Sequence, residues 1–184
     1  MTEFLYDLPL PVLITGLVLL ALLSNFGRPL LRLLGWRKPA HRRRERQARQ
    51  SLAKLAEIPD PGRKFAFLRS INPFTFEEMI LETFEQRGYK VKRNTRYTGD
   101  GGIDGRVWLD GDLFLIQAKR YAGHISAAHV QEFCRMVDAK GCKGFFIHTG
   151  KTGDASRLLA NNQANVWIIS GGKLLDLLDP DRRL

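Results

Sequence analysis

The sequence contains few of the short motifs that build metal or phosphate sites. Its two cysteines, Cys134 and Cys142, do not have the spacing of a zinc-binding pair, and its four histidines never pair with cysteine at such a spacing. The histidines are therefore expected at the surface or with satisfied partners. Phe145 stands where a phosphate loop ending in Gly150 and Lys151 requires glycine. These absences argue against a zinc module and a nucleotide-binding loop.

Acidic residues are scarce in one part of the chain only. The 184 residues carry a formal net charge of +10. Residues 28–64 hold twelve Lys/Arg against three Asp/Glu, a net charge of +9, whereas residues 65–184 carry only +3. A basic chain suits nucleic acid or an anionic membrane surface. The positive charge, however, precedes the main domain.

Charged residues are absent from the 20-residue run Leu8 to Gly27. A membrane-spanning helix needs about 20 apolar residues. The acidic flank before the run and the lack of a clean cleavage site argue against a signal peptide. Basic residues follow the run and place its C-terminal side in the cytoplasm. We therefore expect residues 1–27 to form a single-pass anchor in a bacterial inner membrane.

Residues 28–64 are expected to form a basic connector between this anchor and a folded domain. His41 to Ala56 is rich in Arg, Gln, Ala and Leu, which favours a helix. Its basic residues either bind anionic lipid or DNA, or mainly orient the anchor while lying on the membrane surface. Pro59-Asp60-Pro61-Gly62 breaks the chain. The folded domain is accordingly expected to cover residues 65–184.

Helices and strands are expected to alternate in this domain. The pattern predicts a helix at 75–87, a strand at 89–93, a hairpin turning at Asp110-Gly111, a helix at 126–140, a strand at 144–148, a helix at 155–162 with Leu158 and Leu159 inward, a strand at 166–169 and a last short helix. This order predicts an α/β fold, a three-layer α/β/α domain with a mixed sheet.

The helix at 75–87 carries two adjacent glutamates with different expected positions. Thr75 and Glu78 have the spacing of a capping box. Projection at the helical period places Glu78 outward, toward solvent, and Glu77 beside the inner face. Glu77 is therefore either a surface glutamate or a carboxylate that faces a site at the end of the sheet.

The stretch from Gly99 to Tyr121 contains the residues on which the functional prediction depends. Asp110-Gly111 between two apolar runs is a strong signal for a two-residue hairpin turn. Counting outward from that turn places Asp104 opposite Gln117. A three-residue turn would place Asp104 opposite Ala118 instead.

A carboxylate, an amide and a lysine then meet at the mouth of the hairpin. Gln117 and Lys119 are two residues apart in one strand, so their side chains leave the same face. A carboxylate beside a strand-end lysine suits metal-assisted hydrolysis of a phosphodiester. Asp104 and a nearby backbone carbonyl can hold Mg²⁺, while Lys119 orients or helps to deprotonate water.

These residues resemble the Mrr-type restriction endonuclease family, which belongs to the PD-(D/E)-x-K nuclease superfamily. The matching pieces lie within about residues 72–178 and comprise Phe76-Glu77, Gly88-Tyr89, Gly99 to Gly105 and Gln117 to Tyr121. Gln117 stands where many superfamily members carry Glu, which removes one potential metal ligand. The resemblance implies a restriction-endonuclease-like fold whose active site lies at one open end of the sheet.

The resemblance also implies roles for individual residues. Asp104 and the backbone carbonyl of Ala118 would bind Mg²⁺, Lys119 would activate water, Gln117 would position water or metal, and Glu77 would be an auxiliary carboxylate. Arg120, Tyr121 and, with less support, Gln131 would contact DNA.

Two functions remain open at this stage. The first is a membrane-anchored, Mg²⁺-dependent DNA endonuclease of the type IV restriction kind, with a homodimer as a further expectation. The second is a non-catalytic nuclease-like module that binds nucleic acid or a partner protein at the inner membrane, with Lys119 paired to Asp104. The intact set of Asp104, Gln117 and Lys119 favours the enzyme, whereas the weak charge of residues 65–184 favours caution because DNA binding depends on phosphate contacts.

Overall fold

A computed structural model describes residues 11, 14–15, 39–94 and 102–182 of the chain. The chain divides into Met1–Arg42 and a compact unit, Arg43–Leu184, and the fold given below is that of the second unit. Almost all of the predicted anchor at residues 1–27 lies outside the described residues. Within the described residues, no helix has the length and apolarity needed to cross a membrane.

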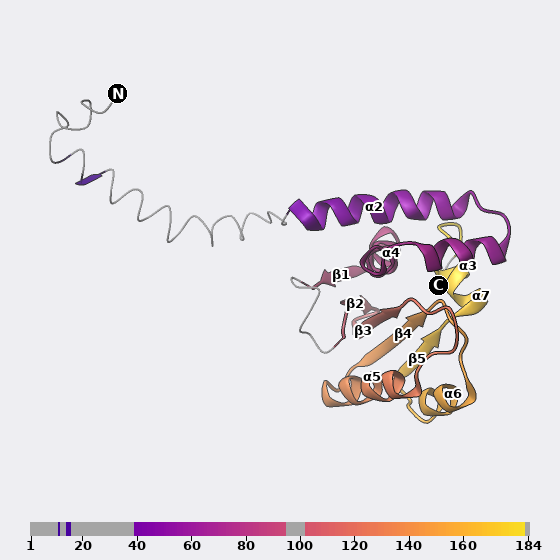
Figure 1. Ribbon diagram of the computed structural model, residues 1–184. Coiled ribbons are helices and arrows are strands. Elements are labelled where there is room, and N and C mark those ends of the chain that lie inside the picture. Colours follow the sequence, from indigo (N-terminus) through magenta and orange to yellow (C-terminus); the bar gives the residue numbers. More distant parts are fainter. Residues whose placement is uncertain (1–10, 12–13, 16–38, 95–101, 183–184) are drawn as a thin grey trace. The chain divides into compact units, whose positions relative to one another are not determined.

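The compact unit is built on a five-stranded mixed sheet whose strand order follows the chain (Figure 1). The strands are β1 (Lys90–Arg93), β2 (Gly105–Leu109), β3 (Asp112–Lys119), β4 (Lys143–His148) and β5 (Val166–Ile169). The first three pair antiparallel, and β4 and β5 continue parallel to β3. The predicted mixed sheet is confirmed.

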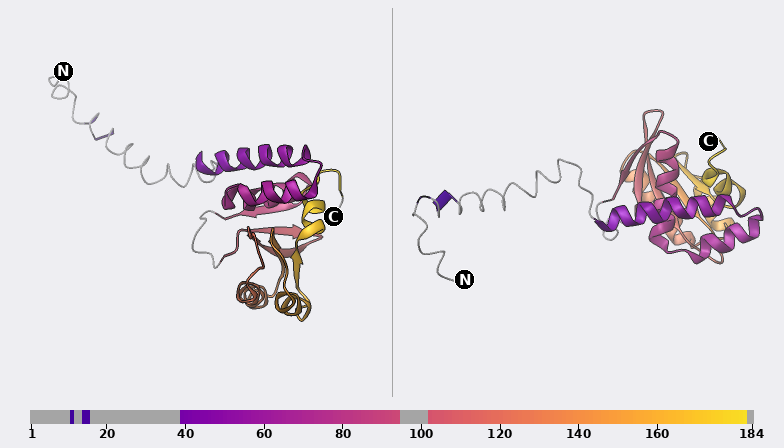
Figure 2. Two further views of the ribbon diagram at one scale, coloured as in Figure 1. Left: turned by 45° about the vertical axis from the view of Figure 1, so that its right-hand side comes forward. Right: turned by 90° about the horizontal axis from the view of Figure 1, so that it is seen from above.

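Helices cover both faces of this sheet. One side carries α5 (Ala127–Ala139) and α6 (Asp154–Asn161), and the other carries α2 (Pro39–Ala56), α3 (Pro61–Ser70), α4 (Pro73–Gln86) and α7 (Gly171–Leu178) (Figures 1 and 2). This is the predicted three-layer arrangement. On α6 the prediction of two inward leucines is wrong for Leu158, which is 63% exposed, while Leu159 packs against the core.

The strand β3 is buried on both faces, as its unbroken apolar run predicted. Ile116 and Ala118 join the larger core cluster with Phe76 of α4. Leu115, the residue before Ile116, packs in the second cluster with Phe133 of α5. Because successive side chains of a strand point to opposite faces, β3 supplies both cores at once.

A two-residue turn joins β2 to β3. Leu109 lies opposite Asp112. Between them, Asp110 and Gly111 have φ angles of +50° and +92°. The mirror-image turns that suit a twisted hairpin require such positive φ values, which Asp and Gly adopt at low cost. The predicted turn is confirmed.

The compact unit starts well before residue 65. Ala48 and Leu55 of α2 and Leu68 of α3 are buried in the larger core cluster with α4 and the sheet. Residues 43–64, which the sequence assigned to a connector, therefore fold as part of the compact unit. The helix α3 was not predicted, although Asp60 caps it by accepting a hydrogen bond from the Arg63 N–H at 2.7 Å.

The helix α4 begins earlier than the predicted capping box. Asn72 is its N-cap and accepts a hydrogen bond from the Phe74 N–H at 2.9 Å. Glu78 is 1% exposed, so the prediction of a solvent-facing cap at Thr75 and Glu78 is wrong. The physical reason is that α2 and β1 cover this side of α4 and provide a cation there.

That cation is Arg93, at the end of β1. Its guanidinium lies 2.9 Å from Glu78, 3.2 Å from Glu82 and 2.7 Å from Glu85, three carboxylates of α4. A fourth carboxylate, Glu45 of α2, is 3.8 Å away. The Arg93 side chain is only 8% exposed, so these ion pairs are largely shielded from water. The network joins α2, α4 and β1 to one another.

Candidate active site

The hairpin brings Asp104 to the end of β3. The two strands pair up to Gly105 opposite Ile116, and the Asp104 N–H then donates to the Ile116 carbonyl at 2.8 Å. The Ala118 N–H donates to Oδ2 of Asp104 at 2.6 Å. Asp104 thus lies one step beyond the last pair, beside Gln117 and Ala118, where counting from the turn predicts it.

Gln117 is buried at the same place, at 5% exposure. Its Nε2 donates to the Gly102 carbonyl at 2.8 Å. Its Oε1 is buried and has no hydrogen-bond partner in the part of the chain that the structure describes. Because buried acceptors are nearly always paired, this oxygen is suited to receive a hydrogen bond from water or to approach a cation.

Gly102 shapes the entrance to this position. Its φ is +85°, and a Cβ at this residue would lie 2.5 Å from Nε2 of Gln117. Both the backbone conformation and the nearby Gln117 amide disfavour a side chain at this residue. The glycine of the loop therefore permits the Gln117 amide to bond the loop backbone.

Two carboxyl groups with raised pKa values meet here. Burial raises the pKa of Asp104 to about 6, although the Ala118 N–H and the Lys119 charge act in the opposite direction. Burial and then the nearby Asp104 charge raise the pKa of Glu77 to about 8, and Lys119 again lowers it. Glu77 of α4 is therefore close to Asp104 and Lys119, and the structure brings the predicted acidic and basic residues together.

The donor set fits Mg²⁺. Asp104 and Glu77 offer carboxylate oxygens and Gln117 an amide oxygen, and Mg²⁺ is commonly held by one or two carboxylates with water completing its shell. A bound cation would also lower the raised pKa values of both carboxyl groups. Across residues 39–94 and 102–182, no group of three His, Cys, Asp or Glu side chains gathers around a common point. A metal here would rely on main-chain and water oxygens in addition.

Thr149, which the sequence did not single out, holds the end of β3. Its N–H donates to the Lys119 carbonyl at 3.3 Å, and its hydroxyl accepts from the Tyr121 N–H at 3.0 Å and donates to the Tyr121 carbonyl at 2.9 Å. Its own carbonyl accepts two hydrogen bonds from Arg69 of α3, at 3.1 and 2.7 Å. The backbone that follows Lys119 is therefore fixed on both sides of Arg120.

The three residues expected to contact DNA differ in their exposure and in their contacts within the domain. Arg120 is exposed and donates from Nη1 to the carbonyl of Arg69. The Tyr121 hydroxyl is hydrogen-bonded to Nδ1 of His129. Gln131 lies exposed on α5. None of these placements tests DNA binding, which stays a prediction.

His148 lies opposite Lys119 in the parallel pair of β3 and β4. It is fully buried, Nδ1 accepts from the Gly150 N–H at 3.1 Å, and Nε2 is 3.0 Å from the Thr152 hydroxyl. Burial lowers the pKa of His148 to about 4, so the ring is neutral at physiological pH. This is a histidine with satisfied partners, as the sequence suggested.

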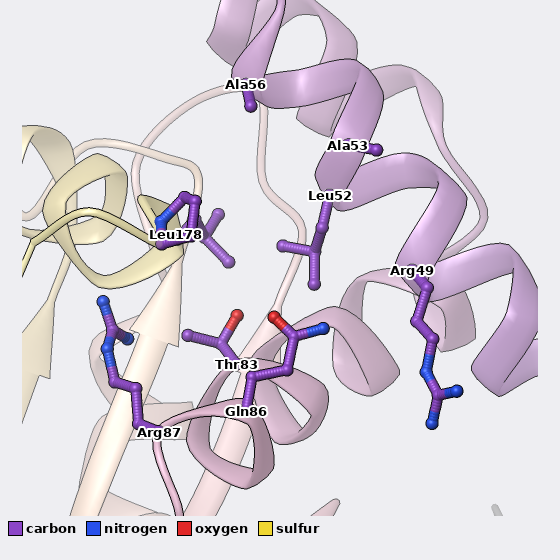
Figure 3. Close-up of a pocket in the computed structure, with 9 residues that line it drawn as sticks. Arg49, Leu52, Ala53, Ala56, Thr83, Gln86, Arg87 and Leu178 are labelled. Atoms are coloured by element: carbon purple, nitrogen blue, oxygen red, sulfur yellow. The ribbon is translucent and has the colours of Figure 1, made fainter.

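A separate cavity of about 290 Å³ lies between α2, α4 and the chain after α7 (Figure 3). Its lining consists of Arg49, Leu52, Ala53, Ala56, Thr83, Gln86, Arg87, Leu178 and Pro180. Both arginines are already engaged, Arg49 with Glu82 at 2.7 Å and Arg87 with main-chain carbonyls at the end of α7. None of Glu77, Asp104, Gln117 and Lys119, which we call the hairpin-end cluster, lines this cavity.

Comparisons with known proteins identify relatives of this domain. Residues 68–178 match the family model of the Mrr catalytic domain, described as a restriction endonuclease. The chain is 29% identical over 119 residues to the type IV methyl-directed restriction enzyme EcoKMrr of Escherichia coli (strain K12), which covers 60% of this chain and 39% of that protein. The chain thus spans well under half of that relative's length.

Two solved structures are also similar. A crystal structure of a protein of unknown function, AF1548, gives a TM-score of 0.45 at 18% identity, over 58% of this chain and 65% of that one. The structure of the restriction endonuclease FokI gives a TM-score of 0.42 at 16% identity, over 68% of this chain and 28% of that one.

Proposed function

Because the chain belongs to the Mrr-type restriction endonuclease family, we propose that its compact unit is a Mg²⁺-dependent DNA endonuclease of the type IV restriction kind. The observation that carries the proposal is the cluster at the end of β3. There the Asp104 carboxylate accepts a hydrogen bond from the Ala118 N–H at 2.6 Å, next to Gln117 and Lys119. The raised pKa of Glu77, which responds to both Asp104 and Lys119, adds a second carboxylate to the same cluster.

Each residue of the cluster has one role in this proposal. Asp104, Glu77 and the Ala118 carbonyl would hold Mg²⁺, which when bound would supply positive charge near the scissile phosphate and make water more acidic. Lys119 orients the attacking water and offsets the negative charge that develops on the phosphate. Oε1 of Gln117, which has no hydrogen-bond partner among the described residues, accepts a hydrogen bond from that water. The Ala118 N–H keeps the Asp104 carboxylate in a fixed orientation.

The competing function is a non-catalytic module in which Lys119 is only the structural partner of Asp104. Such a buried pair would be expected to form a close ion pair. Among the ion pairs of the described residues, none within 4.0 Å joins Lys119 to Asp104. This observation favours the enzyme.

A cleavage assay tests the proposal. The full chain, in a nonionic detergent, is incubated with methylated and unmethylated plasmid in Mg²⁺ or in EDTA. We expect cleavage in Mg²⁺ only, a loss of roughly 10²-fold or more for Lys119→Ala with DNA and Mg²⁺ binding retained, and weaker Mg²⁺ binding for Asp104→Ala. Lys173→Ala, an exposed lysine of α7, is the matched control.

Two results would contradict the proposal. If the parent binds DNA and Mg²⁺ but cuts neither plasmid, the binding module is the better description. If Lys119→Ala unfolds the domain, the lysine is a structural partner and the assignment of the site is wrong.

We also propose that residues 1–27 anchor the chain in a bacterial inner membrane with the nuclease unit in the cytoplasm. The 20-residue uncharged run and its basic C-terminal flank support this. The full chain should remain with membranes in carbonate, whereas a chain without residues 1–27 should be released by salt. Recovery of the full chain as soluble protein would refute the anchor. Sedimentation of the full chain in detergent is a separate test of the expected homodimer.

A further inference from the structure

The first described turns of α2 carry a group of arginines outside the region that matches the family. Arg43 and Arg46 are exposed, and Arg44 is half-buried. We name these three residues the basic turn. They precede residues 68–178, so the family match assigns them nothing.

The basic turn lies close to the hairpin-end cluster. The Arg44 guanidinium is 4.6 Å from the centre of the Phe74 ring, in the first turn of α4. Glu77 follows Phe74 by three residues on that helix, so the two side chains lie on neighbouring positions of one helix face. The cation held over Phe74 is therefore about one helical turn from the place where the scissile phosphate would bind.

The position of α2 is fixed by its neighbours. Glu45 is 8% exposed and faces Arg93 at 3.8 Å, and Arg49 donates to Glu82 at 2.7 Å. Ala48 and Leu55 are buried in the larger core cluster. Because both apolar and charged contacts hold this helix, the basic turn belongs to the same rigid part as α4.

The same contacts distinguish between two partners of a basic helix. An amphipathic helix that binds a lipid surface inserts its apolar face into the membrane. In α2 the apolar residues Ala48 and Leu55 are already buried against the domain, and the exposed charged side chains of the helix are basic. Residues 43–64 add seven Lys/Arg against three Asp/Glu, so the compact unit from Arg43 carries +7 rather than the +3 of residues 65–184. This supplies the positive charge that DNA binding requires.

We propose that the basic turn binds the sugar–phosphate backbone of duplex DNA beside the bond that is cut. The inference rests on the proposed function, since it gives the DNA of that reaction a second point of contact. Arginine is well suited to this role because its planar guanidinium binds phosphate oxygens through two parallel hydrogen bonds.

The test removes two exposed charges and leaves the anchoring contacts intact. Arg43→Gln/Arg46→Gln is compared with Arg63→Gln/Lys173→Gln, which removes two exposed charges from α3 and α7. The full chain in nonionic detergent is titrated against a short duplex in EDTA at several salt concentrations. Each lost phosphate contact lowers the slope of log affinity against log salt by about 0.9, so the first variant should lose about 2 and the second nothing.

Mixed micelles that contain phosphatidylglycerol or phosphatidylcholine are then added as competitors. If both variants bind the duplex like the parent, the inference is overturned. If only competition by phosphatidylglycerol changes in Arg43→Gln/Arg46→Gln, the surface binds lipid and the inference is again wrong. The plasmid assay separates the two proposals. If the parent cuts DNA but both variants bind the duplex like the parent, only the inference is refuted. If the parent cuts nothing but Arg43→Gln/Arg46→Gln binds the duplex more weakly than the parent, only the nuclease proposal is refuted.

Discussion

The Ala118 N–H and the Asp104 carboxylate are joined by a hydrogen bond of 2.6 Å. This bond fixes the acid of one hairpin strand to the strand that ends in Lys119. It favours the charged form of Asp104, yet burial outweighs it and the pKa of Asp104 stays raised, at about 6. The two carboxyl groups of the cluster therefore hold protons more tightly than free side chains do, which has measurable consequences.

Binding of Mg²⁺ at pH 7 should release protons. Glu77, with a pKa of about 8, is mostly protonated at that pH, and a cation binds only the carboxylate form. Calorimetric titration in buffers of different ionisation enthalpy should give different heats for the parent. Glu77→Gln should release fewer protons. Equal heats in all buffers for the parent would exclude Glu77 from the metal site.

The metal-free protein should become less stable as pH rises from about 4.5 to 8. Over this range the folded state holds a proton on Glu77 that the unfolded chain has lost, because the folded pKa is raised. The stability from this proton is complete below pH 4.5 and is lost as pH passes 8. Denaturant unfolding in EDTA should show a smaller decline for Glu77→Gln than for the parent, and parallel curves would contradict the raised pKa.

Replacing Arg93 should destabilise the domain strongly. Arg93→Met leaves Glu78 and Glu82 with side chains only 2% and 4% exposed and without this cation. Breaking a buried ion pair in this way typically costs about 3–5 kcal/mol. Arg135→Met, on the exposed side of α5, should change the free energy of unfolding little. A similar small loss for both variants would show that the network contributes nothing to stability.

Gly102→Ala should impair the site more than a comparable change in the turn. Both Gly102 and Gly111 have positive φ, at +85° and +92°, so alanine costs roughly 1–2 kcal/mol at each. Only at Gly102 does the new Cβ collide with Gln117, whereas Gly111 has open space around it. Cleavage per folded molecule should therefore fall for Gly102→Ala and stay at the parental rate for Gly111→Ala. Equal rates would remove Gln117 from the mechanism.

The Thr149 hydroxyl should matter for turnover rather than for binding. Thr149→Val leaves the N–H and carbonyl of Tyr121 without their buried partner, so the end of β3 can shift and move Lys119. We expect kcat to fall with little change in KM, and Thr149→Ser to restore it because serine keeps the hydroxyl. If valine and serine give the same kcat, the Thr149 hydroxyl does not position Lys119.

The part of the site that could be predicted from the sequence is the part set by local chemistry. Asp110 and Gly111 are the residues that a two-residue turn requires, and a turn of that length fixes which residues of β2 and β3 face each other. The position of Asp104 beside Gln117 follows by counting. Thr149 could not be found in this way, because it reaches β3 from the end of a different strand.

The error at Glu78 has the opposite origin. Helical projection distinguishes only the face toward the sheet from the face away from it, and it assumes that the latter meets solvent. Here that face meets α2 and Arg93, which comes from β1, 15 residues later in the chain. By contrast, α3 carried a readable signal, since Asp60 followed by Pro61 is a typical helix start.

The strand order of the sheet repeats the order of the chain, so the ribosome makes the strands in the order in which they pair. Once β3 has emerged, the Asp104 and Ala118 hydrogen bond can form between neighbouring strands. The partner of Tyr121, Thr149, is made 28 residues later. Thr149, which fixes the end of β3, is therefore made after the two strands that carry Asp104 and Lys119.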